Sequence, residues 1–187
     1  MQARHARNVL ASLEQTVGGP QRVRSRLSSE AAAALAGHSN DEWLRVEVDV
    51  ELSGASREFL VRHQFAALNR QVLSTDLAGP SFRRLIAGAR SVLGEDPARW
   101  ARIVPQIWAV LFKGCGTWAV AAAEPCQVLL TLSGPPQVCL ADDTWLEARA
   151  VALSALVDAA GAVGAVSLTG RDPVRREARF EWRWEKL

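Results

Sequence analysis

The fold is decided by the stretch Glu177-Ala178-Arg179-Phe180-Glu181-Trp182-Arg183-Trp184, in which every second residue is apolar. The residues between the apolar ones are charged, and acidic and basic side chains alternate. Because successive side chains of a strand point to opposite faces, this pattern predicts a half-buried antiparallel strand with one aromatic face and one wet face. Burying each of its aromatic rings is worth roughly 2–3 kcal/mol. We therefore expect the domain to close around this strand.

Three more segments have the period of two that predicts strands. They are residues 117–123, residues 126–133 and residues 163–169. Between the second and the third, a helix is predicted from Asp142 or Asp143 to Ala160; its few polar residues form one narrow stripe, from which Arg149 stands apart. The order predicts an α+β fold, with N-terminal helices followed by a β-hairpin, a helix and a second β-hairpin. The hairpins form a four-stranded antiparallel sheet covered by helices on at least one face.

The segment upstream of the sheet is predicted to be helical. Apolar residues at helical spacing predict a buried helix from Ser56 to about Ser74 and, after the break Gly79-Pro80, an amphipathic helix to Leu93. Asp96-Pro97 starts a further helix, in which Pro105 predicts a kink or two short helices. Residues 43–52 are ambiguous: the alternation of apolar and acidic residues favours a strand, whereas their position ahead of a long helix allows a helix instead.

The composition is that of an ordinary globular protein, with 187 residues, 49% hydrophobic and 22% charged. We expect residues 1–40 to form a poorly defined N-terminal helical segment and residues 41–187 to form a single α+β domain. The formal net charge of +2 indicates neither nucleic acid nor an anionic membrane as a partner. No signal peptide and no membrane span are predicted, and a cytoplasmic location is expected.

Histidine and cysteine are the candidate ligands in this sequence. A histidine can ligate haem iron, so His63 is a candidate, but no second ligand or haem-contacting motif accompanies it. Cys115, Cys126 and Cys139 would bind zinc with a histidine if the fold brought them together, yet their spacing contains no local chelate. Nothing in the sequence places His63 beside Cys115 as a nucleophile pair. We therefore predict no metal site, no catalytic residue and no cofactor.

Sequence motifs of common enzymes are absent, including the Gly-x-Ser-x-Gly elbow, a phosphate-cradling glycine loop and the zinc-protease helix motif, so we predict that the chain is not an enzyme. Two arginine clusters are interpreted as solvated faces rather than phosphate sites. They comprise Arg22, Arg24 and Arg26, and Arg171, Arg175, Arg176 and Arg179. Trp118 and Trp145 flank the first hairpin and the helix after it, where they either belong to the core or line a pocket or an interface.

Several short stretches carry a resemblance to known proteins. They are residues 65–70, Gly79-Pro80, Gly88-Ala89-Arg90, residues 102–108, Lys113-Gly114-Cys115-Gly116 and residues 179–184. Together they resemble a myxobacterial paralogous family with a domain of unknown function. That family is similar to 4-vinyl-reductase-type ligand domains, haem-nitric-oxide-binding domains and the Bet-type subunits of the TRAPP tethering complex. The resemblance covers residues 43–184 and implies the same order of helices and hairpins, in either an assembly subunit or a ligand domain.

These observations predict a non-catalytic protein-interaction or assembly module of a bacterial cytoplasmic system. It would be a homodimer or a subunit of a larger assembly, using the helix at residues 79–93 or that at residues 100–111 as the contact. The alternative is a small-molecule sensor domain that holds an apolar ligand between the helices and the sheet. We favour the interaction module because the sequence shows no convergent polar groups that would orient a ligand.

Overall fold

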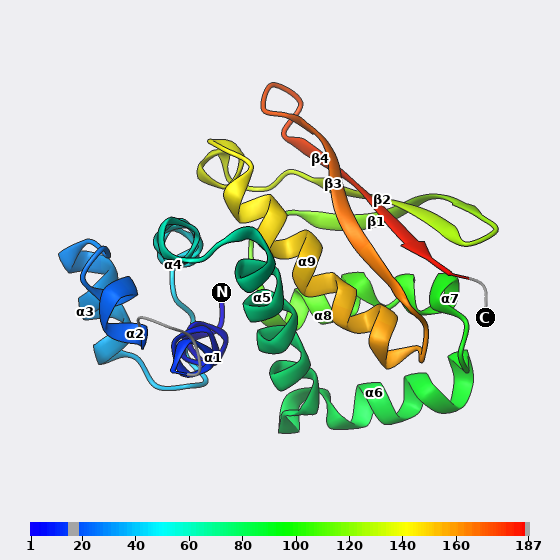
Figure 1. Ribbon diagram of the computed structural model, residues 1–187, viewed down its shortest axis with the longest axis horizontal. Helices are drawn as coiled ribbons and strands as arrows, with labels where there is room; N and C mark the ends of the chain where they lie inside the picture. Colours follow the sequence, from blue (N-terminus) through cyan, green and yellow to red (C-terminus); the bar gives the residue numbers. More distant parts are fainter. Residues whose placement is uncertain (15–18, 186–187) are drawn as a thin grey trace.

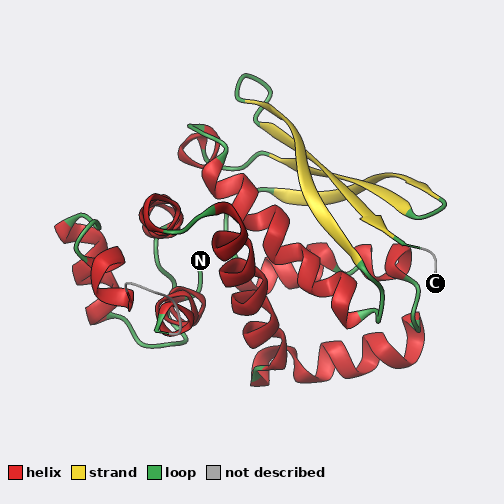
Figure 2. Ribbon diagram, viewed as in Figure 1, coloured by secondary structure: helices red, strands yellow, loops and turns green. Residues whose placement is uncertain are grey.

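The computed structural model describes residues 1–14 and 19–185. Its helices are α1 (Ala3–Leu13), α2 (Gly19–Arg24), α3 (Ser29–Gly37), α4 (Val46–Phe59), α5 (Arg62–Ala78), α6 (Pro80–Leu93), α7 (Pro97–Ala101), α8 (Val104–Leu111), the 3-10 turn η1 (Gln137–Leu140) and α9 (Thr144–Ala159). Its strands are β1 (Thr117–Glu124), β2 (Gln127–Ser133), β3 (Gly164–Asp172) and β4 (Glu177–Trp184). The predicted α+β fold, with helix α9 between two hairpins, is confirmed (Figures 1 and 2).

The stretch that decides the fold is strand β4, which lies inside the sheet. The strand order is β1-β2-β4-β3, and all neighbouring strands are antiparallel. Phe180 and Trp182 are fully buried, at 0% exposure, and face the same side as Leu130 and Val128 of β2, with which they are paired. The aromatic face of this strand therefore forms part of the core, as its alternating pattern predicts.

The helices cover one face of the sheet (Figure 2). Helix α9 packs on β3, and α8 packs on β1. Between these layers, the ring of Trp118 lies 4.7 Å from that of Phe180 and 5.4 Å from that of Trp108, measured between centroids. On the strands, Val120 and Leu129 are more than a third exposed, at 39% and 37%.

The first helices extend the same core. Met1, Ala6 and Leu13 are almost fully buried, at 2% exposure or less, and belong to one cluster of apolar residues with the sheet. Helix α1 packs on α5, whereas α2 and α3 lie on the outer side of α1 and α4 (Figure 1). Residues 1–40 thus hold three helices in the described part, and the first of them is a core element.

The prediction that favoured a strand for residues 43–52 is wrong, because residues 46–59 form helix α4. The buried side of this helix carries Asp49, Ser53 and Ser56 beside Leu52. These polar residues lie at helical spacing, but a pattern based on apolar residues alone places them on the solvent side of the segment. The remaining Val and Glu residues then read as an alternating strand.

The helix predicted from Ser56 to about Ser74 is also corrected. Helix α4 ends at Phe59, and Leu60 and Val61 have extended backbone angles, with ψ of 130° and 159°. Helix α5 then runs from Arg62 to Ala78. The predicted effect of Pro105 is confirmed, since the segment after Asp96 forms two short helices and Pro105 lies in the first turn of the second.

The described residues contain no helix that is both long and apolar enough to cross a membrane. The segment at residues 100–111, one of the two expected contact surfaces, buries most of its large apolar side chains. Trp100, Ile107 and Trp108 are at most 6% exposed. Its exposed side carries Arg102, Gln106 and Ala109, so it offers little apolar surface to a partner.

We predict that Trp182→Ala lowers the free energy of unfolding by about 3–5 kcal/mol, because it leaves a cavity between the sheet and the helices. Urea denaturation followed by circular dichroism measures this loss. Val174→Ala is the control, since Val174 is 94% exposed and its truncation is expected to change stability by less than about 0.5 kcal/mol. A loss below about 1 kcal/mol for the tryptophan variant would contradict the core position of this ring.

Candidate functional site

A cluster of polar side chains lies in the interior where helices α1, α4, α5 and α9 meet. We call it the core network. It consists of His5 and Asn8 of α1, Asp49 of α4, Asp76 of α5, and Trp145 and Arg149 of α9. The four ionisable members are between 0% and 4% exposed, so they are held by contacts with one another and with neighbouring polar side chains in place of water.

His5 joins two members of the core network. Its Nδ1 lies 2.6 Å from Oδ2 of Asp76, and its Nε2 lies 2.9 Å from Nη1 of Arg149. Because a guanidinium can only donate, Nε2 accepts, which places the ring proton of a neutral imidazole on Nδ1. Nδ1 then donates to Asp76, whose second oxygen accepts from the Asn8 amide at 2.6 Å. Both ring nitrogens of His5 are therefore engaged.

Asp49 is the second buried carboxylate of the core network. Its Oδ2 accepts from Trp145 Nε1 at 2.7 Å and lies 3.2 Å from Nη1 of Arg149. The Arg149 guanidinium also packs over the rings of Phe112 and Trp145, at 5.2 and 5.5 Å from their centroids. Two buried atoms of the described residues have no hydrogen-bond partner here, Oδ1 of Asp49 and Nε of Arg149.

The chemical capacity of the core network is limited by its enclosure. The cavity beside His5 and Arg149 has a volume of only about 20 Å³ and is otherwise lined by apolar side chains such as Leu73, Ile107 and Phe112. Such a volume holds about one water molecule. The network therefore stabilises the packing of its own helices, because each buried charge requires a partner that another helix supplies.

A larger hollow lies between helices α5, α6 and α9, and we call it the α6 groove. It is open to solvent and has a volume of about 510 Å³. Its lining residues are Ser74, Leu77 and Ala78 of α5, Arg83, Ile86, Ala87 and Arg90 of α6, and Ala155, Asp158 and Ala159 of α9. The lining is mostly apolar, and three of its residues are charged: Arg83, Arg90 and Asp158.

The charges of the α6 groove differ in their partners. Asp158 forms a two-pronged ion pair with Arg70, which donates from Nε and Nη2. The guanidinium groups of Arg83 and Arg90 make no hydrogen bond or ion pair with another described residue. Two guanidinium groups of the groove are thus available to an anionic group, whereas its only carboxylate is already neutralised.

The residues singled out from the sequence lie apart from one another. His63 is exposed in the first turn of α5, and Cys126 is half-buried in the turn between β1 and β2. Cys115 and Cys139 are buried, and burial raises the pKa of each thiol. In residues 1–14 and 19–185, no three or more His, Cys, Asp or Glu residues form a group that could hold a metal ion.

The predicted aromatic and arginine positions have structural contacts. Trp118 and Trp145 are buried, at 5% and 1% exposure, and so belong to the core. In the second arginine cluster, Arg176 donates to the backbone carbonyls of Gly134 and Pro135. In the same cluster, Arg171 pairs with Asp143 at 2.8 Å. Arg22, Arg24 and Arg26 are exposed, and Arg26 lies 3.7 Å from Glu58.

Sequence reasoning missed His5, Asp49 and Asp76. The only local signal of the core network is Arg149, a single basic residue away from the polar stripe of an otherwise apolar helix. A buried arginine requires a carboxylate from another element, but the sequence does not say which one. The α6 groove could not be predicted either, because it depends on how three helices cross.

No protein-family model matches the chain, and no curated protein matches it. Solved structures do. An Fe(II) unliganded H-NOX protein from K. algicida matches with a TM-score of 0.68 at 9% identity, over 100% of this chain and 98% of that chain. An oxygen-binding H-NOX domain related to soluble guanylate cyclases matches at 0.64 and 10%, over 100% and 96%. An H-NOX protein from S. oneidensis matches at 0.63 and 10%, over 100% and 97%.

These similarities show the fold. They agree with the resemblance to haem-nitric-oxide-binding domains, whereas the resemblance to a myxobacterial family has no support from a family model. One further match, at a TM-score of 0.61, was described in work on haem redox potential and porphyrin distortion. The fold thus raises the question of whether this chain can hold haem.

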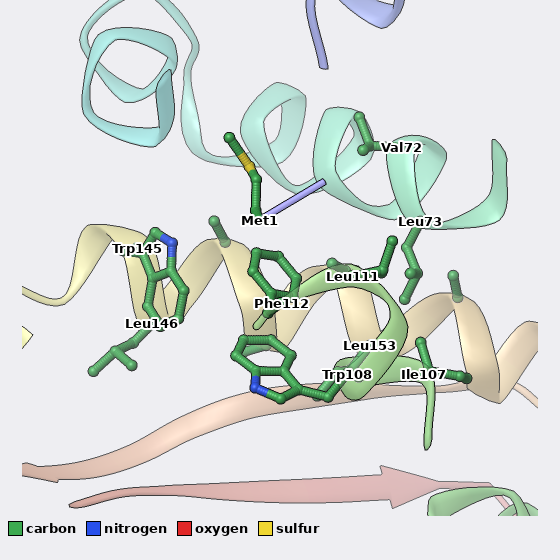
Figure 3. Close-up of a cluster of buried hydrophobic side chains, with 14 of the residues drawn as sticks. Met1, Val72, Leu73, Ile107, Trp108, Leu111, Phe112, Trp145, Leu146 and Leu153 are labelled. Carbon is green, nitrogen blue, oxygen red and sulfur yellow. The ribbon is translucent and has the colours of Figure 1, made fainter. Parts of the chain in front are cut away.

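The interior of this chain does not fit a haem group. Trp108 and Phe112 stack with their ring centroids 4.1 Å apart, and Trp145 lies edge-on to both (Figure 3). These rings fill the space beside α9, and the 20 Å³ that remains near His5 is far below the roughly 300 Å³ of the smallest usual ligand pockets. His5 also has no free ring nitrogen to offer to iron.

The other two histidines do not supply a haem site. His63 is exposed on α5. His38 lines a hollow of about 390 Å³ between α3 and α4, where Nδ1 of His38 lies 2.8 Å from the carbonyl oxygen of Ala34. Three glutamates and one arginine, Arg45, line this hollow, and an excess of carboxylates is unsuited to the carboxylates of a porphyrin. The α6 groove contains none of the His, Cys, Met or Tyr side chains that ligate haem iron.

We predict that Asp49→Asn and Arg149→Met each cost about 3–5 kcal/mol in urea denaturation, because each leaves a buried partner uncompensated. The double variant is expected to lose about 1–3 kcal/mol less than the sum, since it removes both charges. Arg26→Met is the control, because its pair with Glu58 is about 60% exposed on both sides and is worth less than about 1 kcal/mol. Additive losses would contradict the coupling of Asp49 and Arg149.

We also predict that hemin added to the purified protein gives no stoichiometric Soret band of ligated iron in an absorption titration. The reason is the filled interior and the engaged ring of His5. The His5→Ala, His38→Ala and His63→Ala variants are expected to give the same spectra as the unsubstituted protein. A one-to-one complex whose band is lost in one of these variants would contradict the fit described above.

Proposed function

We propose that this chain is a non-catalytic small-molecule sensor domain that works without haem and binds an apolar molecule in the α6 groove. The observation that carries the proposal is the groove, whose volume of about 510 Å³ falls within the roughly 300–1,000 Å³ of ligand pockets. Its mostly apolar lining suits a molecule that leaves water. The similarity to H-NOX domains, one of them an oxygen-binding domain related to soluble guanylate cyclases, supports a sensor over an assembly subunit.

A sensor must transmit the presence of its ligand, and helix α5 connects the two relevant regions. Ser74 and Leu77 of α5 line the groove, whereas Asp76 lies between them in the sequence and points into the core network. The carboxylate of Asp76 holds His5 and Asn8 of α1, and its backbone carbonyl accepts from the amide of Gly79 at 2.9 Å. A ligand that shifts the last turn of α5 would therefore change the contacts that hold α1.

Helix α9 provides a second connection. Ala155, Asp158 and Ala159 line the groove near the end of α9, and Arg149 lies less than two turns before Ala155. Arg149 contacts both Asp49 of α4 and His5 of α1. Both helices that form the floor of the groove thus contribute a charged member to the core network, which supports coupling between the groove and the N-terminal helices.

The interaction module remains the second candidate, because the rest of the protein covers little of helix α6. Only Phe82 and Ala89 of this helix are buried, and Val92 is 72% exposed. A second copy or a partner seated on α6 would cover the groove. The two candidates therefore predict different effects of a bulky residue on this helix.

The test is the binding of Nile red, a neutral dye that fluoresces in apolar surroundings. We predict saturable one-to-one binding that is lost in Ala87→Trp, since Ala87 is exposed and lines the groove, so that an indole there fills it without entering the core. Val92→Trp is the matched control on the same helix and is expected to bind as the unsubstituted protein does. Hydrogen exchange of residues 3–13 should change on binding.

Other results would contradict the sensor. Absence of saturable binding, or equal binding by the Ala87→Trp protein, would show that the groove is not a ligand site. A dimer that dissociates in both tryptophan variants, measured by sedimentation velocity, would support the interaction module instead. Binding without any change of exchange in α1 would show a ligand site that is not coupled to the core network.

A further inference from the structure

Resting on the proposed sensor function, we propose that the ligand of the α6 groove is an amphipathic anion: a single apolar chain that ends in a carboxylate or a comparable acidic group. The apolar chain would lie on the groove floor, and the acidic group would pair with the guanidinium group at one end of the groove, that of Arg83 or that of Arg90. This assignment concerns charge and shape only, and it follows from three features of the groove.

The first feature is the spacing of the two arginines on α6. Arg83 and Arg90 both line the groove and are seven residues apart, which is two helical turns, or about 10 Å along the helix axis. Ile86 and Ala87 lie between them on the same wall. The wall is therefore apolar in its middle and cationic at both ends, which suits an elongated molecule with an acidic end.

The second feature is that these two cations lack partners. Arg70, beside the groove, is paired with Asp158, and Arg176, in a turn, is paired with backbone carbonyls. The exposed guanidinium groups of Arg83 and Arg90 have no such contact with any described residue. A guanidinium without a protein partner can donate two parallel hydrogen bonds to a carboxylate.

The third feature is the charge balance of the groove. Asp158 is its only acidic lining residue, and the ion pair with Arg70 offsets it. The helix ends of α5 and α9 add partial negative charge from free carbonyl groups, equivalent to about half an elementary charge each. Two full positive charges outweigh these partial charges, so the groove favours an anion over a cation.

The floor sets the shape of the ligand. Leu77 and Ala78 of α5 and Ala155 and Ala159 of α9 are small or aliphatic, and no aromatic residue lines the groove. Flat aromatic ligands would find no ring to stack on. A flexible hydrocarbon chain instead follows an irregular aliphatic surface, and a chain about 10 Å long spans the distance from Arg83 to Arg90.

The test compares three compounds with the same chain and different charge: decanoate, decanol and decyltrimethylammonium. Each is used to displace Nile red from the 187-residue chain at concentrations below its critical micelle concentration. We predict that decanoate binds about tenfold more tightly than decanol and that the ammonium compound binds most weakly. The preference for decanoate is expected to shrink as salt is raised, because screening weakens partly exposed ion pairs.

Arginine variants identify the groups that confer the preference. Arg83→Met and Arg90→Met keep an apolar chain and remove the charge, and the double variant is expected to bind decanoate no more tightly than decanol. Arg84→Met is the matched control, because Arg84 is exposed on the same helix and does not line the groove. The control variant should keep the full preference for decanoate.

Failure of the anionic ligand class can be distinguished from failure of the proposed function. If Nile red and decanol bind but decanoate shows no preference, or if the double variant keeps the preference, the anionic ligand class is wrong and the apolar groove stands. If none of the decyl compounds displaces the dye and Ala87→Trp does not affect dye binding, the groove is not a ligand site at all. That result overturns the proposed function together with this inference.

Discussion

A buried charge must find an opposite charge or a hydrogen-bond donor or acceptor inside the molecule, and in this protein that constraint holds four helices together. Arg149 of α9 lies inside the molecule, where its guanidinium needs both Asp49 of α4 and the ring of His5 on α1. His5 in turn needs Asp76 of α5. Removal of any of these elements would leave an uncompensated polar group in the core, so the N-terminal helices cannot pack independently of the sheet and α9.

A steric constraint acts where helix α6 begins. Helix α6 follows α5 after a single residue, Gly79, where a side-chain Cβ would lie 2.9 Å from the carbonyl oxygen of Asp76. The turn into α6 therefore lies beside a residue whose carboxylate belongs to the core network. This proximity is the physical basis for proposing that the groove and the network are coupled.

Local patterns were sufficient for the sheet and for most helix boundaries. Strand β4 alternates apolar and charged residues over its whole length, and Gly, Pro and Asp mark the ends of the helices around it. Helix α4 could not be predicted in this way, because its buried side includes Asp49, whose burial depends on Arg149, 100 residues later in the sequence. The core network could not be predicted from the sequence for the same reason. His5 and Arg149 contact each other but are 144 residues apart, and no local pattern links them.

Fold and ligand are specified by different residues in this chain. The match to H-NOX domains at about 10% identity shows that the same backbone fold forms from chains that share few identical residues. Here the interior is filled by Trp108, Phe112 and Trp145 together with the core network, which leaves no room for a large group. The proposed ligand must therefore bind where side chains leave space and unpaired charge, and of the hollows described above the α6 groove combines both.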